Sequence, residues 1–349
     1  GIDFIHSEFI YDDFKDQVLL PQKLSQLGPD LVTGDLNNDG LDDVILSGAK
    51  YQEITVFLQT TDGRFTKKRN NAFEKDRPYE TIGLHLFDYD GDGDLDLYAA
   101  NGSYEFEENS NYFQDILYAN DGYGNFSKTD KLPEILSPTK KIKSFDYDGD
   151  GDLDLFVGGR LSAKKYPLPP KSYILQNNKG TFVDMTSKIA PEFENVGMVT
   201  DMVFSDFDGD GDKDLIVVGE WMPVSFFENT GGAFYPLSIE ALDNSEGWWQ
   251  SIAIIDIDND GDDDYLLGNL GKNNKFHPTL EKPLHVYASY LDDNASFDMV
   301  LSKVYKGKLV PTRGKECSSQ QNPFLTEKYQ SYKEFANSSL EDMYGEQVL

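Results

Sequence analysis

Residues 206–214 read D-F-D-G-D-G-D-K-D, and close copies of this nonapeptide recur along the chain. The copies begin at Asp35, Asp88, Asp146, Asp206 and Asp256, so consecutive starts lie 53, 58, 60 and 50 residues apart. Each copy has Asp at positions one, five and nine, Asp or Asn at position three, and Gly at position six. Five copies in one register indicate a structural repeat rather than a solvated acidic turn.

The spacing within each loop fits Ca²⁺, which takes about six to eight oxygen ligands. Oxygens at positions one, three and five can turn to one side of a tight loop, and position nine closes the site. Glycine at position six permits the positive φ that wraps the backbone round an ion, and position seven adds its carbonyl oxygen. The predicted ligands of the five sites are Asp35, Asn37, Asp39, Leu41 and Asp43; Asp88, Asp90, Asp92, Asp94 and Asp96; Asp146, Asp148, Asp150, Asp152 and Asp154; Asp206, Asp208, Asp210, Asp212 and Asp214; and Asp256, Asp258, Asp260, Asp262 and Asp264.

The loops differ from EF-hands at position twelve and in their flanking segments. An EF-hand needs a bidentate Glu at position twelve and a helix on each side. Position twelve here is apolar in every copy: Leu46, Ala99, Val157, Val217 and Leu267. The flanking runs, such as V-F-S-D-F-D and D-L-I-V-V-G around the fourth loop, are short and β-branched, so each loop is predicted to join two strands of a hairpin.

A second repeated element, Gly-x-Phe, comes after four of the loops, at residues 63–65, 124–126, 180–182 and 232–234. Its Phe precedes the next loop by 23, 20, 24 and 22 residues, whereas the distance from the loop to the Phe varies from 28 to 38. The unit therefore reads as four antiparallel strands per 50 to 60 residues, which is typical of a β-propeller blade. Successive connections alternate faces, so the acidic loops and the Gly-x-Phe turns should share one face and the variable loops the other.

These loops resemble the FG-GAP/VCBS repeats of integrin α-subunit propellers and of many bacterial surface proteins. The resemblance implies an all-β propeller of four-stranded blades, with about six blades' worth in this chain as part of a seven-bladed or larger array. A degenerate sixth copy runs from Tyr290 through Asp292 to Asp298, with Tyr290 at position one and Ala295 at position six, and is expected to bind metal weakly or not at all. It starts early, so the fifth blade is expected to be irregular. The predicted divisions are a lead-in segment at 1–30 that could supply a closing strand, blades at 31–310, and a helical insertion at 311–349.

Several phrases, including G-E-W-M-P, G-W-W-Q-S and G-N-L-G-K-N-N-K-F, resemble very large VCBS-repeat proteins with an ASPIC/UnbV domain. That resemblance implies a bacterial surface lipoprotein that works beside starch-utilisation-type outer-membrane transporters. It also leads us to expect that this chain is part of a longer polypeptide.

Composition agrees with an extracellular calcium protein. The formal charge is −31, and 25 of the 62 acidic residues lie in the five loops, so bound Ca²⁺ would neutralise part of it. The acidic remainder disfavours nucleic acid and anionic lipid as partners. Cys317 is the single cysteine, so the chain cannot form an internal disulfide, and bound metal is the expected stabilising cross-link. The sequence has no transmembrane run, and carboxylate loops of modest affinity suit a calcium-rich compartment outside the cell.

The face away from the acidic loops is predicted to carry a ligand or partner site. Indole rings beside amide and guanidinium donors suit a sugar ring or a peptide, and the alternative is that the Trp side chains pack between blades. The residues are Trp221, Trp248, Trp249, Asn269, Asn273, Asn274, Arg313, Glu316 and Gln320.

Three further segments interrupt the β pattern. The insertions at 101–113, which is acidic and aromatic, and 158–172, which is basic and rich in Pro, could each form a partner-docking lip or a solvated loop. In the third segment, at 323–345, Pro323 can open a helix, Ser331-x-x-Glu334 reads as a capping box, and Gly345 fits a helix stop. Two or three short helices are predicted there.

The sequence favours binding over catalysis. It contains no G-x-S-x-G, no H-E-x-x-H and no phosphate-binding Gly loop. We therefore expect a calcium-stabilised, cell-surface binding or scaffold module with protein partners in an outer-membrane complex and no catalytic residues. The alternatives are a glycan-binding, lectin-like module and a calcium-dependent enzyme acting on polysaccharides.

Overall fold

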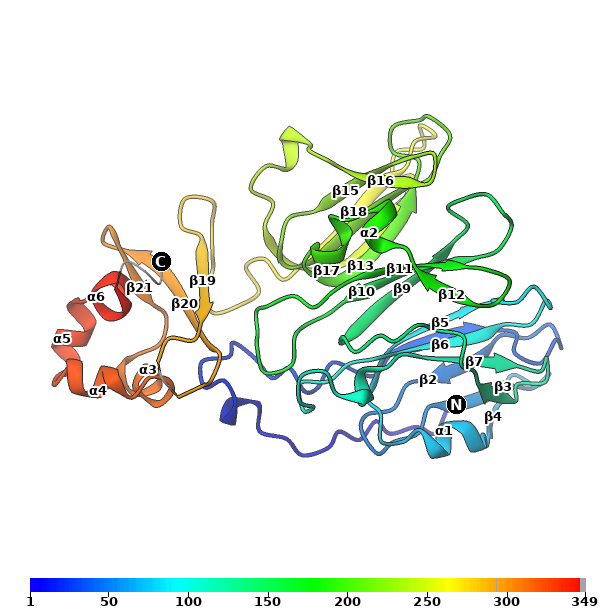
Figure 1. Ribbon diagram of the computed structural model, residues 1–349, viewed down its shortest axis with the longest axis horizontal. Coiled ribbons are helices and arrows are strands. Elements are labelled where there is room, and N and C mark those ends of the chain that lie inside the picture. The colour runs from blue at the N-terminus through cyan, green and yellow to red at the C-terminus, as the bar shows by residue number, and fades with distance from the viewer. Residues whose placement is uncertain (293, 346–349) are drawn as a thin grey trace.

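The computed structural model describes residues 1–292 and 294–345, and its strands form a series of small antiparallel sheets (Figure 1). Four repeats each build a four-stranded blade whose neighbouring strands follow one another along the chain. The blades consist of β1 (Leu31–Gly34), β2 (Asp43–Leu46), β3 (Thr55–Gln59) and β4 (Phe65–Lys68); β5 (Thr81–Phe87), β6 (Asp96–Asn101), β7 (Ile116–Asn120) and β8 (Phe126–Lys128); β9 (Thr139–Phe145), β10 (Asp154–Gly159), β11 (Tyr173–Asn177) and β12 (Phe182–Asp184); and β13 (Met198–Ser205), β14 (Asp214–Met222), β15 (Ser225–Thr230) and β16 (Ala233–Leu237). The predicted all-β, propeller-like architecture is confirmed.

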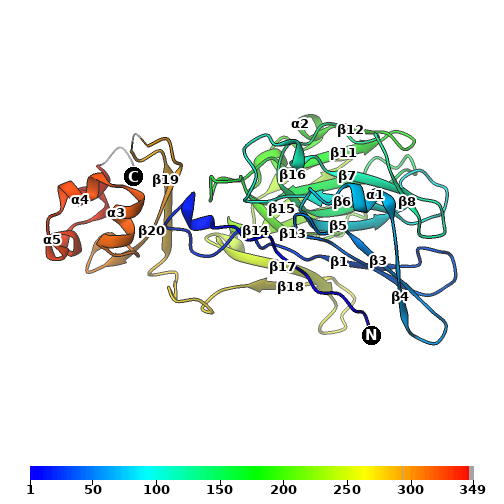
Figure 2. The same cartoon turned by 90° about the horizontal axis from the view of Figure 1, so that it is seen from below.

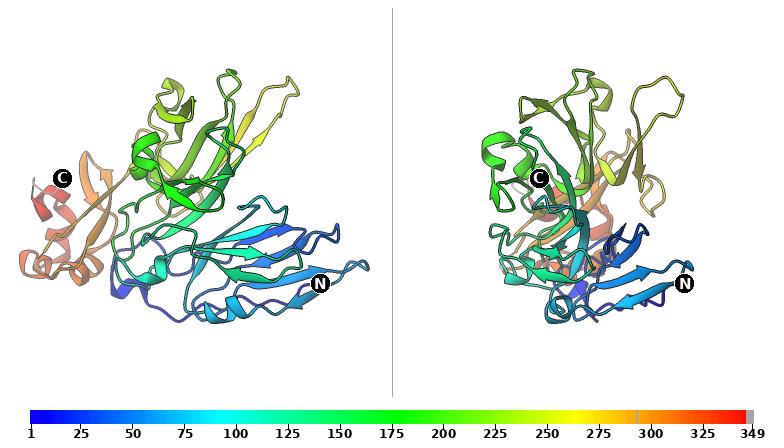
Figure 3. Two further views of the ribbon diagram at one scale, coloured as in Figure 1. Left: turned by 45° about the vertical axis from the view of Figure 1, so that its right-hand side comes forward. Right: turned by 90° about the vertical axis from the view of Figure 1, so that its right-hand side faces the viewer.

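The later repeats depart from this pattern. The fifth builds only a ribbon, β17 (Gly247–Ile255) and β18 (Asp264–Asn269), and β17 also pairs with the end of β14 through Glu220 and Trp248. A three-stranded sheet of β19 (Leu284–Ser289), β20 (Asp298–Tyr305) and β21 (Lys308–Pro311) lies with the C-terminal helices at the other end of the molecule (Figure 2). The described sheets do not close into a ring, and the fifth blade is irregular as its spacing predicted (Figure 3).

The hydrophobic core lies between consecutive blades. The second strands of the second and third blades contact a blade on each side and are buried along their whole length, as in β10. Alternate residues of that strand face opposite neighbours because side chains in a strand alternate. The shared clusters contain Ile45 and Leu97 between the first and second blades, Tyr98 and Leu155 between the second and third, Phe156 and Leu215 between the third and fourth, and Ile216 and Ile252 between the fourth blade and the ribbon.

Residues 1–30 form an irregular strap rather than the closing strand suggested by their position. Their regular structure is one 3-10 turn, η1 (Asp13–Lys15). Buried Gln17 anchors the strap because its Nε2 donates to the carbonyl oxygens of Tyr166 and Phe297 at 2.8 and 2.9 Å, and its Oε1 accepts from the Tyr104 hydroxyl at 2.6 Å. Leu20 and Leu24 of the strap pack in one cluster with side chains from the second, third and sixth repeats. The strap thus joins the blades to the C-terminal sheet.

The helices are short. Connections between strands hold α1 (Asn71–Lys75), η2 (Asn111–Phe113), α2 (Thr186–Ile189), η3 (Phe193–Asn195) and η4 (Glu240–Leu242), and the C-terminal group is α3 (Lys315–Gln321), α4 (Phe324–Lys328), α5 (Tyr332–Asn337) and α6 (Leu340–Tyr344). Pro323 precedes α4, the predicted capping box opens α5, and Gly345 follows α6 at φ 86°. Helix α3 lies inside the predicted 311–349 insertion but before the 323–345 segment in which individual helices were predicted. Within the described residues, no helix has the length and apolar character needed to cross a membrane. The last four residues of the predicted 311–349 insertion lie outside the described residues.

Candidate metal centres and the opposite face

Each of the five acidic loops is held in its turn by the same hydrogen bond. The main-chain N–H of the position-six glycine donates to Oδ2 of the position-one Asp, over 2.8, 2.9, 3.0, 3.1 and 3.2 Å from the first loop to the fifth. All five glycines have φ between 82° and 100°, a region that costs other residues strain. They are Gly40, Gly93, Gly151, Gly211 and Gly261. The turn therefore requires glycine at position six for a backbone reason.

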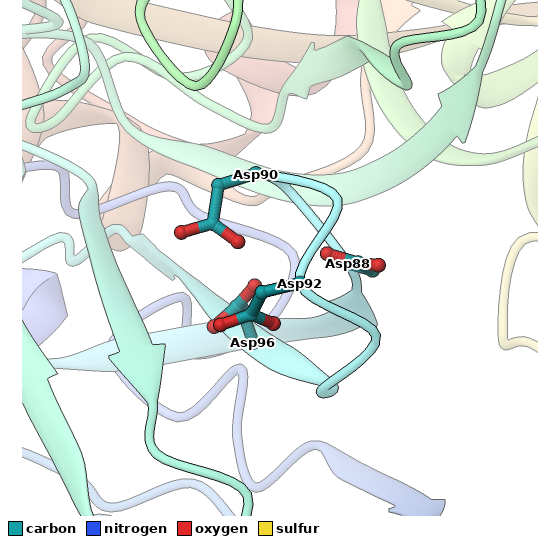
Figure 4. Close-up of side chains that lie close together, drawn as sticks. All are labelled: Asp88, Asp90, Asp92 and Asp96. Carbon is teal, nitrogen blue, oxygen red and sulfur yellow. The ribbon is translucent and has the colours of Figure 1, made fainter.

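Carboxylates converge in four of the loops. In the second, oxygens of Asp88, Asp90, Asp92 and Asp96 lie within 4.8 Å of one another and point into the loop (Figure 4). The corresponding groups are Asp146, Asp148 and Asp154 in the third loop, Asp206, Asp208 and Asp210 in the fourth, and Asp256, Asp258 and Asp260 in the fifth. Each of these groups could hold a metal ion.

The predicted ligands at position three of the first loop and at position seven of the second and third loops have side chains that hydrogen-bond outside the converging carboxylate groups. In the first loop Asn37 takes position three, and its Nδ2 donates to Asp39 Oδ2 at 3.1 Å. The position-seven side chains of the second and third loops turn to neighbouring turns: Asp94 accepts from Asn38 Nδ2 at 2.7 Å, and Asp152 accepts from the Lys179 N–H at 3.1 Å. Position seven was predicted to use its main-chain carbonyl, so its side chain is left for these contacts.

The position-nine Asp joins its loop to the rest of the blade. Asp96 is 1% exposed; its Oδ2 accepts from the Tyr89 N–H at 3.1 Å and its Oδ1 from the Asn120 N–H on β7 at 2.8 Å. The same two bonds recur in every complete blade, with Oδ1 distances of 2.7 to 2.8 Å to the third strand. Position nine therefore fixes where the third strand lies relative to the loop.

Burial changes the acidity of these groups. It raises the pKa of Asp96 and of Asp154 to about 7, although the two main-chain N–H bonds to each act in the opposite direction. It raises the pKa of Asp43 and Asp214 as well. A divalent cation beside such a carboxylate would favour its ionised form. The loops thus fit a cation by donor type and by their unbalanced negative charge.

The degenerate sixth loop joins β19 and β20 and holds its carboxylates differently. Asn322, after α3, donates its Nδ2 to Asp298 Oδ2 at 2.8 Å and to Asp292 Oδ2 at 3.3 Å. A neutral amide thus lies against two carboxylates of this loop. Asn322 was missed because nothing local marks a residue 24 positions after Asp298 as its partner. Asp293, inside this loop, lies outside the described residues.

A second set of residues missed from sequence lies at the ends of the third strands. Asn177 Nδ2 donates to the carbonyl oxygens of Leu153 in its own loop and Tyr89 in the preceding blade, at 3.2 and 2.8 Å. Its Oδ1 accepts from the N–H of Gly180, the first residue of the Gly-x-Phe turn, at 2.7 Å. Asn120 makes the same three kinds of contact. The recurrence of Asn before Gly-x-Phe was the available sequence signal.

The opposite face brings four of the nine predicted ligand-face residues together. Trp221, Trp248, Asn269 and Asn274 line a cavity of about 80 Å³. The two indoles meet edge to face with centroids 5.2 Å apart, and Trp221 Nε1 donates to the Tyr166 hydroxyl at 2.7 Å. Trp221 also has φ 58°, which is strained for a bulky residue and is often seen at functional sites.

The other five predicted residues of this face lie apart from the cavity. Trp249 packs between the fourth blade and the ribbon, and its Nε1 donates to the Ser245 carbonyl at 2.8 Å. Arg313 donates to the Leu20 carbonyl of the strap at 3.4 Å. Glu316 and Gln320 are exposed on α3, and Asn273 is exposed in the loop after β18. Trp249 therefore packs between blades, which was the alternative considered for the Trp residues.

The two long insertions contact each other. Phe106 and Phe113 of the acidic insertion form a buried cluster with Ala163 of the basic one. Ion pairs join Lys165 to Glu108 at 2.7 Å and Lys164 to Glu107. The opposite charges noted in the sequence therefore meet within the molecule.

The repeats identify the family. A profile of the FG-GAP-like repeat matches residues 35–99, 146–217 and 206–267, which is more than half of the chain. The chain belongs to the FG-GAP-like repeat family. Each match of this FG-GAP protein begins at the first Asp of a loop and ends at position twelve of a following loop.

Two solved structures resemble the FG-GAP protein distantly. One is an Agrocybe aegerita lectin, described as recognising non-reducing terminal N-acetylglucosamine. It is 21% identical over 59% of this chain and 50% of that one, at TM-score 0.40. The other is the V. cholerae biofilm matrix protein Bap1, with 12% identity over 81% of this chain and 36% of that one, at TM-score 0.32. The chain spans half or less of the length of each. No curated protein matches it.

Proposed function

We propose that this FG-GAP protein is a calcium-stabilised binding module that works outside the cell, at a bacterial surface. The observation that carries the proposal is the hydrogen-bonded frame common to all five loops, in which the position-one and position-nine carboxylates are already fixed by main-chain N–H groups. Positions one, three, five and nine would hold the ion with side-chain oxygens, and position seven would add its carbonyl. Bound calcium would supply positive charge that ties the ends of each hairpin together.

Calcium is favoured over other metals by the donor set. Each loop offers oxygen ligands alone, which disfavours zinc and copper, and it offers more of them than the few that Mg²⁺ takes directly from protein. The extracellular location rests on two supports: loops of this type suit calcium at high concentration, and a formal charge of −31 suits a partly neutralised, calcium-loaded chain.

The proposed role is to present loops to a partner, with binding rather than catalysis as the activity. Rigid calcium hairpins on one face would hold the variable loops of the other face in position. The partner class we propose is protein in an outer-membrane or extracellular complex. Surface location is tested by adding protease to intact cells of the source organism; protection from the protease until the cells are lysed would contradict it.

Calorimetric titration of chelator-stripped protein with CaCl₂ tests the calcium sites. We expect about five binding events, and Asp88→Asn with Asp90→Asn should remove one of them because the second loop loses two of its oxygen charges. Asp130→Asn is the matched control, since Asp130 is an exposed carboxylate outside the loops. Absence of calcium heat, or the same loss in the control, would contradict the proposal.

The Trp221–Trp248 cavity favours glycan binding as a second candidate. Two indoles, with Asn269 and Asn274 at the rim, supply apolar area and amide donors in one place. On a polysaccharide array, Trp248→Ala should abolish binding while the melting temperature stays close to that of the parent. Tyr123→Ala is the control, because Tyr123 is a 70% exposed aromatic in the Gly-x-Phe turn beside the acidic loops. Equal loss in both variants would rule out this site.

A further inference from the structure

The fifth repeat has an unpaired strand edge where the complete blades have a third strand. In the third blade, Leu155, Phe156 and Val157 of β10 pair with β11, and the same three positions pair in each complete blade. Among the residues that the structure describes, the corresponding residues of β18, Tyr265, Leu266 and Leu267, pair on one side only, with β17. We name Tyr265–Leu267 the open edge.

Side chains at the open edge are less buried than those at the matching positions of the complete blades. The two positions that face the preceding blade are fully buried in the second, third and fourth blades: Leu97 and Ala99, Leu155 and Val157, Leu215 and Val217. Tyr265 and Leu267 pack against the fourth blade in the same way but stay partly exposed. Phe207 of the fourth loop is also partly exposed, whereas its counterpart Tyr147 packs against Phe234 of the next blade.

The hydrogen bonds show the same gap. Every position-nine Asp of a complete blade accepts a second N–H from the third strand, and Asp298 of the sixth repeat accepts instead from the Asn322 amide. Asp264 keeps the bond from the Ile257 N–H at 2.9 Å, but it has no such second donor among the described residues. A strand laid along the open edge would supply that donor.

The open edge also lacks the features that protect sheet edges from pairing. Natural edge strands carry Lys or other charges, or Pro. The outermost strands of the complete blades follow this rule, with Lys67 and Lys68 in β4, Lys128 in β8, Asp184 in β12 and Pro236 in β16. Between the ends of β18 the sequence is Y-L-L-G, without charge or Pro. The ribbon stands free along this side (Figure 3).

We propose that the open edge binds a β-hairpin from a partner protein that carries the same repeat. The second, third and fourth blades define the chemistry of that hairpin: two consecutive apolar residues, one further residue, then Asn, followed by a Gly-x-Phe turn, as in I-L-Q-N-N-K-G-T-F at residues 174–182. Its backbone extends the sheet, its Asn N–H reaches Asp264, and its Phe covers Phe207. This surface adjoins the fifth loop at Asp264 but is separate from the Trp221–Trp248 cavity, and binding of a β-hairpin there goes beyond the function proposed above.

The test is binding of a labelled peptide with the sequence of residues 172–184 to the full chain in excess calcium. We expect saturable fluorescence anisotropy and slower hydrogen exchange at the amides of β18. A peptide with Ile174→Ser and Leu175→Ser should not bind, because it loses the apolar pair. Asn177→Leu should weaken binding by about tenfold or more, because the loop carbonyl oxygens lose the side-chain amide donor that bonds them in the third blade.

Three outcomes would overturn the proposal, and all use unmodified protein, so misfolding of a variant cannot obscure them. The first is no saturable binding of the parent peptide. The second is equal binding of a scrambled peptide, or protection that appears elsewhere than β18. The third is a dimer in sedimentation whose β18 amides are protected and which the peptide does not dissociate, since the occupant would then be a second copy of this chain.

Discussion

The second and fifth repeats begin with similar nonapeptides, D-Y-D-G-D-G-D-L-D and D-I-D-N-D-G-D-D-D, and build different structures around them. Both loops have the glycine turn and a convergent carboxylate cluster. In the second repeat Tyr89 is 7% exposed, whereas its counterpart Ile257 in the fifth is 69% exposed. The nonapeptide therefore specifies the turn and the first hairpin. The third and fourth strands, together with the following blade, supply the burial.

Calcium removal should have the largest effect and should not distinguish the two repeats. At calcium 100-fold above the Kd, each independent site contributes roughly 2.7 kcal/mol, so stripping several sites should lower Tm by more than roughly 10 °C. Differential scanning calorimetry with and without EGTA measures this. Hydrogen exchange should show both the 88–96 and 256–264 loops losing protection. Loss confined to the fifth loop would show that the metal frame is not common to the repeats.

Core truncation should separate a complete blade from the ribbon. Ile216→Ala in β14 should lower the free energy of unfolding by roughly 2–5 kcal/mol, because Ile216 is fully buried between the fourth blade and the ribbon. Leu266→Ala at the matching position of β18 should cost less than roughly 1 kcal/mol, because Leu266 is 62% exposed. Urea unfolding measures both. Equal costs would mean that Leu266 is buried in solution, by a partner or a second copy.

The position-nine carboxylates offer a finer contrast. Asp96→Ala should cost roughly 2–3 kcal/mol in EGTA, because the buried N–H groups of Tyr89 and Asn120 lose their acceptor. Asp264→Ala should cost less than roughly 1 kcal/mol, since it removes one bond, to the exposed Ile257. Urea midpoints in EGTA exclude the contribution of metal. A larger cost for Asp264 would contradict the role of the third strand.

The pH dependence of the calcium-free protein is the smallest expected effect. The pKa of Asp96 and Asp154 is about 7 in the folded protein against 3.8 as the ordinary value, so the folded state binds these protons more tightly. Their contribution to stability is fully present below about pH 4 and is lost as the pH rises through 7. Tm in EGTA should fall by roughly 2–4 °C between about pH 5 and pH 8. Asp96→Asn should flatten that slope, and an unchanged slope would assign the titration to other groups.

Local chemistry explains how much of this structure the sequence could predict. Oxygen-bearing side chains at alternate positions and a glycine at a fixed position define each acidic loop. The Gly-x-Phe turn marks the second hairpin of each blade and shows that it lies on the same face as the acidic loop. The blades and the carboxylate clusters can therefore be inferred from short segments of sequence. The capping box at Ser331 is local in the same way. The early start of the sixth copy predicted an irregular fifth repeat, whereas Gln17 and Asn322 depend on partners far along the chain. No periodicity records such partners, so these features emerged only from the fold.

The anchoring of Gln17 bears on the order in which the chain can fold. Its two carbonyl partners lie 149 and 280 residues later, so the strap cannot complete its contacts until the sixth repeat has been made. The early blades, whose pairings are local, can form while the N-terminal segment is still exposed to solvent and to chaperones. Docking of that segment would then follow the synthesis of the sixth repeat and depend on the presence of the C-terminal sheet.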